Sequence, residues 1–231
     1  MRGAGCTWND IVDRKVDAGV ERTRGRSLPS GELKLHHALI WMALQSAVGA
    51  AVLFKLNKFA GGVALLSLLL VAIYPTMKRI TSWPQVVLGF AFNWGALVGY
   101  AAVTGTLSWA TVALYFGGVA WTMVYDTIYA MQDQRDDAVV GVRSTARRFA
   151  AAPRRWLSFF AVLAIGFWIA TGLLAPLGIG YFVLLAGIAA HLCWQIALLK
   201  PDDQADCLLR FKSNRLVGWL MLAALIVDRI A

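Results

Sequence analysis

The chain is dominated by apolar stretches that are each about as long as a membrane is thick. A helix needs about 20 mostly apolar residues to cross the hydrocarbon core, and seven segments fit that length: 36–56, 59–77, 84–103, 107–129, 156–175, 178–199 and 214–231. Hydrophobic residues make up 59% of the sequence, compared with about 45–50% in a soluble domain. The period-2 alternation of a membrane barrel is missing. We therefore predict an all-α, polytopic transmembrane helical bundle, with residues 1–231 as one integral-membrane domain.

The charged residues indicate which helix ends share one side of the membrane. All of the 22 Lys and Arg residues except Lys55, Lys58 and Arg229 lie in four alternating loops, at 1–35, 78–82, 130–155 and 200–215. Every acidic residue except Asp228 lies on the same side. By the positive-inside rule, this side faces the cytoplasm or its organelle equivalent. We interpret the net charge of +9 as the basic residues that fix the orientation of the spans and contact lipid headgroups. We expect no nucleic-acid partner.

The first acidic motif is N-D-I-V-D-R-K-V-D, from Asn9 to Asp17. On a helix, Asn9, Asp13 and Asp17 share one face because they are spaced four residues apart, and Asp10 lies one turn before Asp13. Together these side chains make a stripe of oxygen atoms. A charge run at a helix end is usually only a solvated face, so this motif alone does not predict a site.

The second acidic motif is D-T-I-Y-A-M-Q-D-Q-R-D-D, which follows an apolar run. We predict that Asp126, Tyr129, Asp133 and Asp137 lie on one helical face. Carboxylates at this spacing repel one another, and near hydrocarbon they are costly unless they are paired, protonated or bound to a metal. Two such motifs on one side of the membrane predict a site in which carboxylates and an amide oxygen hold Mg²⁺, together with a substrate diphosphate.

Basic loops follow the helices on the same side. After the first motif comes E-R-T-R-G-R-S-L-P-S-G, which contains Arg22, Arg24 and Arg26. Another span ends in Y-P-T-M-K-R, which contains Tyr74, Lys78 and Arg79. Arg and Lys donate hydrogen bonds to phosphate and neutralise the charge that develops on a leaving diphosphate. Positive-inside anchoring accounts for many of these residues, but less well for Lys78 and Arg79 beside Tyr74 at the end of a span.

The two motifs resemble those of the UbiA-type intramembrane aromatic prenyltransferases, N-D-x-x-D-x-x-x-D and D-x-x-Y-A-x-x-D-x-x-x-D. The Tyr129-Ala130 pair and the doubled Asp136-Asp137 look most like the 4-hydroxybenzoate polyprenyltransferase branch. Further similar stretches are R-T-R-G-R-S-L-P-S-G, Y-P-T-M-K-R, W-P-Q-V-V-L-G-F-A-F-N-W-G and F-K-S-N-R. The resemblance therefore covers nearly the whole chain.

The resemblance implies transfer of a polyprenyl group from its diphosphate to 4-hydroxybenzoate, with Mg²⁺, in ubiquinone biosynthesis. Its implied ligands for Mg²⁺ and diphosphate are Asn9, Asp13, Asp17, Asp126, Asp133 and Asp137. Phosphate or the benzoate carboxylate would contact Tyr74, Lys78, Arg79 and the loop containing Arg22, Arg24 and Arg26. Catalytic roles would fall to Asp126, Tyr129, Lys78 and Arg79. Aromatic rings such as those of Trp94, Tyr125 or Tyr129 would stabilise an allylic cation.

The chain departs from the family pattern at its beginning. The family has nine membrane helices, with the first acidic motif at the end of the second helix. Here only eight residues precede Asn9, about two helical turns. We expect that one whole helix and most of another are missing, so that about seven of nine spans are present in an N-terminally truncated chain. A smaller departure is Ser27 before Leu28, where the family usually has proline.

Other functions remain open. Within the family, the acceptor would be a haem, chlorophyll or menaquinone precursor; outside catalysis, the chain would be an inactive remnant or an interaction protein. A divalent-cation transporter would place polar residues along the centres of its spans, whereas here the carboxylates cluster at one end. We expect an integral protein of the bacterial or mitochondrial inner membrane, with the acidic motifs on the cytoplasmic or matrix side. Protein partners, the prenyl length and the oligomeric state do not follow from the residues.

Overall fold

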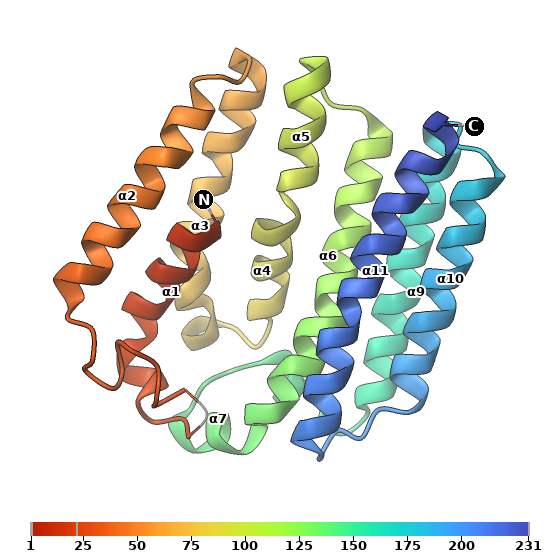
Figure 1. The fold of residues 1–231 in the computed structure, drawn as a ribbon. Helices are drawn as coiled ribbons and strands as arrows, with labels where there is room; N and C mark the ends of the chain where they lie inside the picture. Colours follow the sequence, from red (N-terminus) through yellow and green to blue (C-terminus); the bar gives the residue numbers. More distant parts are fainter. Residues whose placement is uncertain (1, 22, 231) are drawn as a thin grey trace. The chain divides into compact units, whose positions relative to one another are not determined.

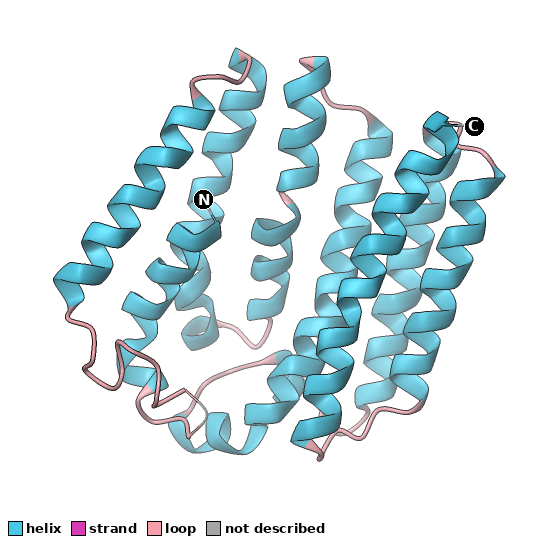
Figure 2. Cartoon of the chain, viewed as in Figure 1, coloured by secondary structure: helices cyan, strands magenta, loops and turns pink. Residues whose placement is uncertain are grey.

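The computed structural model describes residues 2–21 and 23–230, and these fold into helices joined by short loops. Figure 2 shows helices and loops throughout, with no strand in the described part of the chain. The prediction of an all-α fold is therefore confirmed. The chain forms two compact units, one from Met1–Thr106 and Asp133–Ser144, the other from Leu107–Gln132 and Thr145–Ala231. The prediction of a single domain stays a prediction.

The first unit is built around α3 (Figure 1). Its helices are α1 (Arg2–Asp17), α2 (Leu35–Leu53), α3 (Lys58–Ile80), α4 (Pro84–Asn93), α5 (Gly95–Thr104) and α7 (Gln134–Val140). Helix α1 packs against α2 and α3, while α4 and α5 also pack on α3. Asn57 begins α3, because its side chain accepts a hydrogen bond from the amide of Ala60 at 2.9 Å. Gly105, which ends α5, has a φ of 70° that favours glycine.

The second unit is built around α6. It contains α6 (Trp109–Ala130), α8 (Thr145–Arg148), α9 (Pro153–Leu174), α10 (Ile179–Ala197) and α11 (Gln204–Ile230). Helix α6 packs against α9, α11 and α8, and α10 packs against α9 and α11. Ser108 caps α6, because its hydroxyl accepts a hydrogen bond from the amide of Thr111 at 3.2 Å. Between α6 and α7 lies a short 3₁₀-helix, η1 (Met131–Asp133).

Five segments of the described chain are long and apolar enough to cross a membrane: Leu35–Leu53, Lys58–Ile80, Pro84–Thr104, Pro153–Leu174 and Ile179–Ala197. They match five of the seven predicted spans and support an integral membrane protein. Exposed aliphatic side chains on α2, such as Leu44 and Val48, suit contact with lipid.

The predicted span 107–129 corresponds to α6, and the described part of the predicted span 214–231 belongs to α11; neither helix belongs to that set. Helix α6 is less apolar because it carries Trp, Thr, Gly and Tyr, and most of its side chains pack inside the unit, including the fully buried Val124 and Ile128. A helix in protein surroundings accepts Thr, Gly and Tyr where a lipid-facing helix needs aliphatic residues. The apolar run therefore predicted a helix correctly. The apolar side chains of this helix mostly pack against other helices of the unit.

Close packing of α6 on α9 depends on Gly117. A Cβ atom at this position would lie 2.3 Å from the indole nitrogen of Trp168, and Trp168 is buried. We expect Gly117→Ala to lower the free energy of unfolding by about 1–3 kcal/mol, as overpacking does in other cores. Thermal unfolding in detergent would measure the loss. The control is Gly166→Ala on α9, where a Cβ meets no atom within 4 Å; equal stability of the two variants would contradict the prediction.

Candidate functional site

Helix α1 places the first acidic motif on one helical face, as predicted. Asp13 and Asp17 are buried, with 1% and 7% of their surface exposed, and Asn9 is half-buried. The helix ends at Asp17, where the buried hydroxyl of Thr23 donates a hydrogen bond to the Asp17 carbonyl at 2.9 Å. That bond satisfies one of the carbonyls that a helix end leaves without a partner. The loop after α1 is thereby fixed to the motif it follows.

Asp13 faces two cations from the last turn of α3. The Lys78 Nζ lies 2.6 Å from the Asp13 Oδ2, and the Arg79 Nη2 lies 3.6 Å from the Asp13 Oδ1. Arg79 also donates a hydrogen bond to the carbonyl of Val12 at 2.9 Å. The Lys78-Arg79 pair, predicted to contact substrate, therefore lies directly on the first acidic motif.

The other two carboxylates of α1 share Arg26. Its Nη1 lies 3.2 Å from the Asp10 Oδ1 and 3.0 Å from the Asp17 Oδ2. Arg24, by contrast, lies 3.6 Å from Glu21 in an exposed pair, and Arg22 lies outside the described residues. Of the three arginines predicted in this loop, Arg26 is the one described in contact with the motif.

The electrostatics of Asp13 combine two opposing effects. Burial raises the pKa of Asp13 above its usual range, while the ammonium of Lys78 and the guanidinium of Arg79 lower it. The Asp13 Oδ1 is buried and has no hydrogen-bond partner among the described residues. An acceptor atom left in this state is costly, and it is available to a ligand that replaces the basic side chains.

The donor types on α1 fit Mg²⁺, which prefers carboxylate and carbonyl oxygens. Within the described residues, however, no three His, Cys, Asp or Glu side chains are close enough together to hold a metal ion. The α1 carboxylates instead face Arg26, Lys78 and Arg79. In this arrangement, basic side chains neutralise the oxygens that would bind a metal.

The second acidic motif does not form one continuous helical face. Helix α6 ends at Ala130, η1 spans Met131–Asp133 and α7 begins at Gln134. A 3₁₀-helix turns 120° per residue, against 100° in an α-helix, so the prediction of one continuous helical face from Asp126 to Asp137 is wrong. Asp126 and Tyr129 belong to the second unit, and Asp133 and Asp137 to the first.

Contacts that the sequence spacing does not predict join α7 to the loop after α1 and to the end of α3. The Asp136 Oδ2 accepts a hydrogen bond from the amide of Glu21 at 3.3 Å. After Gly141, whose φ of 77° ends the helix, the backbone amide of Arg143 donates to the Lys78 carbonyl at 2.9 Å. The Arg143 side chain donates to the carbonyl of Ile80 at 2.8 Å. Asp136 and Arg143 therefore position α7 beside the end of α3.

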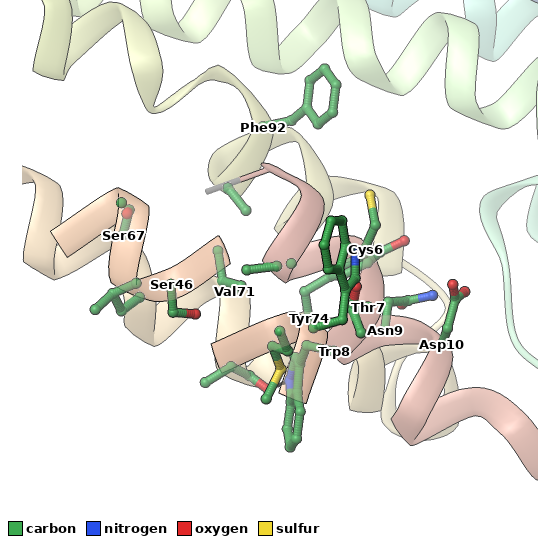
Figure 3. Close-up of a pocket in the computed structure, with 18 of the residues that line it drawn as sticks. Cys6, Thr7, Trp8, Asn9, Asp10, Ser46, Ser67, Val71, Tyr74 and Phe92 are labelled. Atoms are coloured by element: carbon green, nitrogen blue, oxygen red, sulfur yellow. Dashed lines mark hydrogen bonds between the residues drawn. The ribbon is translucent and has the colours of Figure 1, made fainter. Parts of the chain in front are cut away.

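An apolar cavity of about 1820 Å³ lies within the first unit, lined by α1 to α5 and the loop after α1. Asn9, Asp10 and Arg26 belong to its lining, as does Tyr74 of α3. Figure 3 shows Asn9 and Asp10 at one side of this lining, with Ser46 of α2 and Ser67 of α3 at the other. Trp94 also lines the cavity, and its indole donates to the carbonyl of Val63 at 2.8 Å. A polar group bound at Asn9 and an apolar chain in the cavity would be adjacent.

The F-K-S-N-R stretch of α11 contacts aromatic side chains of α6 in the second unit. The Asn214 Oδ1 accepts a hydrogen bond from the indole of Trp121 at 2.8 Å. The ring of Phe211 lies 4.5 Å from that of Tyr129 and 6.0 Å from that of Tyr125. Tyr125, which was predicted to face an allylic cation, is buried. These contacts hold the aromatic face of α6 that carries Tyr129, one turn from Asp126.

Comparison with known proteins decides the family. Residues 1–226 match the UbiA prenyltransferase family. The chain belongs to this family. It is 46% identical over 231 residues to the mitochondrial 4-hydroxybenzoate polyprenyltransferase of Aedes aegypti, which it covers to 52% of its length. It is 42% identical to the enzyme of the same name from Rattus norvegicus, covering 62% of that protein. In both comparisons all of this chain is aligned.

Solved structures confirm the UbiA fold. The apo structure of a UbiA homologue from Aeropyrum pernix K1 matches with a TM-score of 0.83 at 25% identity, covering 99% of this chain and 85% of the homologue. A UbiA homologue from Archaeoglobus fulgidus, bound to DMAPP and Mg²⁺, matches with a TM-score of 0.69 at 17% identity, covering 99% and 83%. At that lower identity the second match shows the fold alone.

Proposed function

We propose that this protein transfers a polyprenyl group from polyprenyl diphosphate to 4-hydroxybenzoate, in ubiquinone biosynthesis. The observation that carries the proposal is the pair of buried carboxylates, Asp13 and Asp17, held against Lys78 and Arg26. Arg26 also lines the apolar cavity. Relatives at 41–46% identity are named 4-hydroxybenzoate polyprenyltransferases. This chain spans about half to three-fifths of the length of these relatives, so their activity is a proposal for this chain.

The proposed site uses both acidic motifs. Its ligands for Mg²⁺ and diphosphate are Asn9, Asp13, Asp17, Asp126, Asp133 and Asp137. A bound Mg²⁺ would neutralise charge on the leaving diphosphate, and the relative from Archaeoglobus fulgidus binds this metal with DMAPP. Arg26, Lys78 and Arg79 donate to phosphate oxygens or to the benzoate carboxylate, a role in which arginine forms paired hydrogen bonds.

The reaction breaks the bond between the allylic carbon and the diphosphate oxygen, and forms a bond between that carbon and the aromatic ring. Water must be excluded while the allylic carbon is electron-poor, and the apolar cavity beside Asp10 supplies such surroundings for the prenyl chain. Tyr129 offers a ring face toward developing positive charge. The released ring proton passes to a carboxylate, and Asp126, one helical turn from Tyr129, is the group we propose.

The protein is an integral membrane protein, and we propose a bacterial or mitochondrial inner membrane as its location. The relatives named above are mitochondrial. The concentration of Lys and Arg on one side supports placing the acidic motifs toward the cytoplasm or matrix. Its proposed partners are the two substrates and the lipid bilayer.

The acceptor is tested by prenyl transfer in membranes that contain the 231-residue chain. We expect Mg²⁺-dependent prenylation of 4-hydroxybenzoate, and little transfer to menaquinone, haem or chlorophyll precursors offered at equal concentration. Asp133→Ala is the inactive control, and a version extended upstream in frame runs in parallel. Activity in the extended version alone would show that upstream residues are needed; transfer to a different acceptor, or none in either version, would contradict the proposal.

A further inference from the structure

The start of α9 carries basic side chains in a part of the sequence that has no acidic residue. Between residues 138 and 201 the chain contains six Lys and Arg residues and no Asp or Glu. Two of these six, Arg154 and Arg155, are exposed at the beginning of α9. The basic residues beside α1 pair with carboxylates, whereas the ion pairs of the described residues include neither Arg154 nor Arg155. Their guanidinium groups are therefore available to an anion from outside the protein.

Arg154 is held in place by the neighbouring helix of the same unit. Its Nη2 donates a hydrogen bond at 2.8 Å to the carbonyl of Leu199, just after the end of α10. Guanidinium carries five N–H donors in a fixed plane, so the other donors of Arg154 are preorganised for an anion. Acidic side chains of the next segment are engaged locally. Asp203 accepts hydrogen bonds from backbone amides at the start of α11, and Asp206 pairs with Arg210 at 3.2 Å.

The same end of α9 presents apolar side chains on the face below Arg155. Phe159 and Val162 follow Arg155 by four and seven residues, so the three share one helical face. Phe159 is 55% exposed and Val162 72% exposed, and Val162 lies about 10 Å from Arg155 along the helix axis. The exposed ring of Trp156 stacks on Phe149 with the ring centres 4.8 Å apart. Tryptophan is enriched where headgroups meet hydrocarbon, so this end of α9 suits the membrane interface.

We propose that Arg154 and Arg155 bind the phosphate of an anionic phospholipid, with an acyl chain of that lipid lying on Phe159 and Val162. Arginine donates paired hydrogen bonds to phosphate oxygens, and basic pockets at the ends of membrane helices bind anionic headgroups. Ser158, exposed three residues after Arg155, adds a hydroxyl group for the headgroup. A soluble anion would contact the arginines alone, whereas a phospholipid uses both the charge and the apolar face. The site lies within the second unit, and it does not depend on the proposed prenyl transfer.

The test measures binding of phosphatidylglycerol and phosphatidylcholine to the purified full chain in detergent by native mass spectrometry. We expect the wild type to bind a first phosphatidylglycerol molecule more tightly than phosphatidylcholine. In the double variant Arg154→Met/Arg155→Met, the affinity for that phosphatidylglycerol should fall about tenfold, because each basic side chain near a headgroup contributes to the attraction. Soluble glycerol phosphate should not displace the lipid, since it has no acyl chain. Displacement by glycerol phosphate would overturn the assignment to a phospholipid.

The matched control is Lys212→Met/Arg215→Met, which removes two exposed cations from α11 in the same unit. We expect this control to keep most of the affinity for phosphatidylglycerol. Equal losses in the two double variants would show general attraction between charges and would overturn the site.

A single variant covers the case in which loss of the bond from Arg154 to Leu199 prevents folding. The Arg155 side chain makes no hydrogen bond or ion pair within the described residues, so Arg155→Met should fold. Its affinity for phosphatidylglycerol should still fall several-fold, and Arg155→Lys, which keeps the charge, should restore most of the binding. Unchanged affinity in Arg155→Met would contradict the proposal.

Discussion

Asp13→Asn should reduce prenyl transfer by about 10²–10³-fold, the usual range when one preorganised electrostatic group is removed from a transition state. The amide keeps the size of the carboxylate but loses the charge that would hold a metal. Asp13 is the most buried acidic side chain of α1 and contacts both Lys78 and Arg79. No other position of the first motif combines these properties.

The measurement is the rate of product formation as a function of Mg²⁺ concentration. Asp10→Asn is the matched control, since Asp10 lies one turn before Asp13 but is 41% exposed at its side chain and pairs with Arg26 alone among the described ion pairs. We expect the control to change the rate only a few-fold, in keeping with the small contribution of exposed ion pairs. Similar rates for Asp13→Asn and wild type would contradict a role of the first motif in the reaction.

Arg210→Met should lower the free energy of unfolding by about 1.5–3 kcal/mol, because it removes charge-assisted hydrogen bonds from a buried side chain. The Arg210 Nη2 lies 3.2 Å from the Asp206 Oδ1 and donates to the carbonyl of Leu198 at 3.3 Å. The guanidinium also lies 4.2 Å from the centre of the Trp194 ring. This one side chain therefore joins α11 to the end of α10.

The loss is measured by unfolding in detergent, monitored by circular dichroism. Arg215→Met is the control, because it removes an exposed arginine from the same helix and should change stability by less than about 0.5 kcal/mol. If both variants unfold at the same temperature, the ion pair of Arg210 contributes no net stability. Such a result would mean that desolvation of the pair offsets its attraction.

Parts of the fold can be predicted from the sequence, because a helix that crosses a membrane must be long enough and mostly apolar. The span predicted at 84–103 corresponds to Pro84–Thr104, and those predicted at 156–175 and 178–199 to α9 and α10. The break between α4 and α5 at Trp94 does not follow from hydropathy. Next to this break the Asn93 side chain donates a hydrogen bond to the Gly89 carbonyl at 2.9 Å, a contact that an apolar pattern does not predict.

For the candidate site, the sequence predicted part of the helical geometry but not the contacts between helices. Spacing placed Asp13 and Asp17 on one face of a helix, and the structure confirms this. The same rule failed for Asp126 to Asp137, because three residues of 3₁₀-helix change the rotation. Contacts between Lys78 and Asp13 depend on how α3 packs against α1, which is tertiary information that spacing does not contain.

The proposed function is tested most directly by a structure of the chain in lipid nanodiscs with Mg²⁺ and a non-hydrolysable polyprenyl thiodiphosphate. We expect a metal bound by Asp13 and Asp17 and by carboxylates of the second motif. Lys78 and Arg26, now 2.6 Å and 3.0 Å from those carboxylates, would be found on phosphate oxygens. A diphosphate bound away from α1, with Lys78 still paired to Asp13, would contradict it.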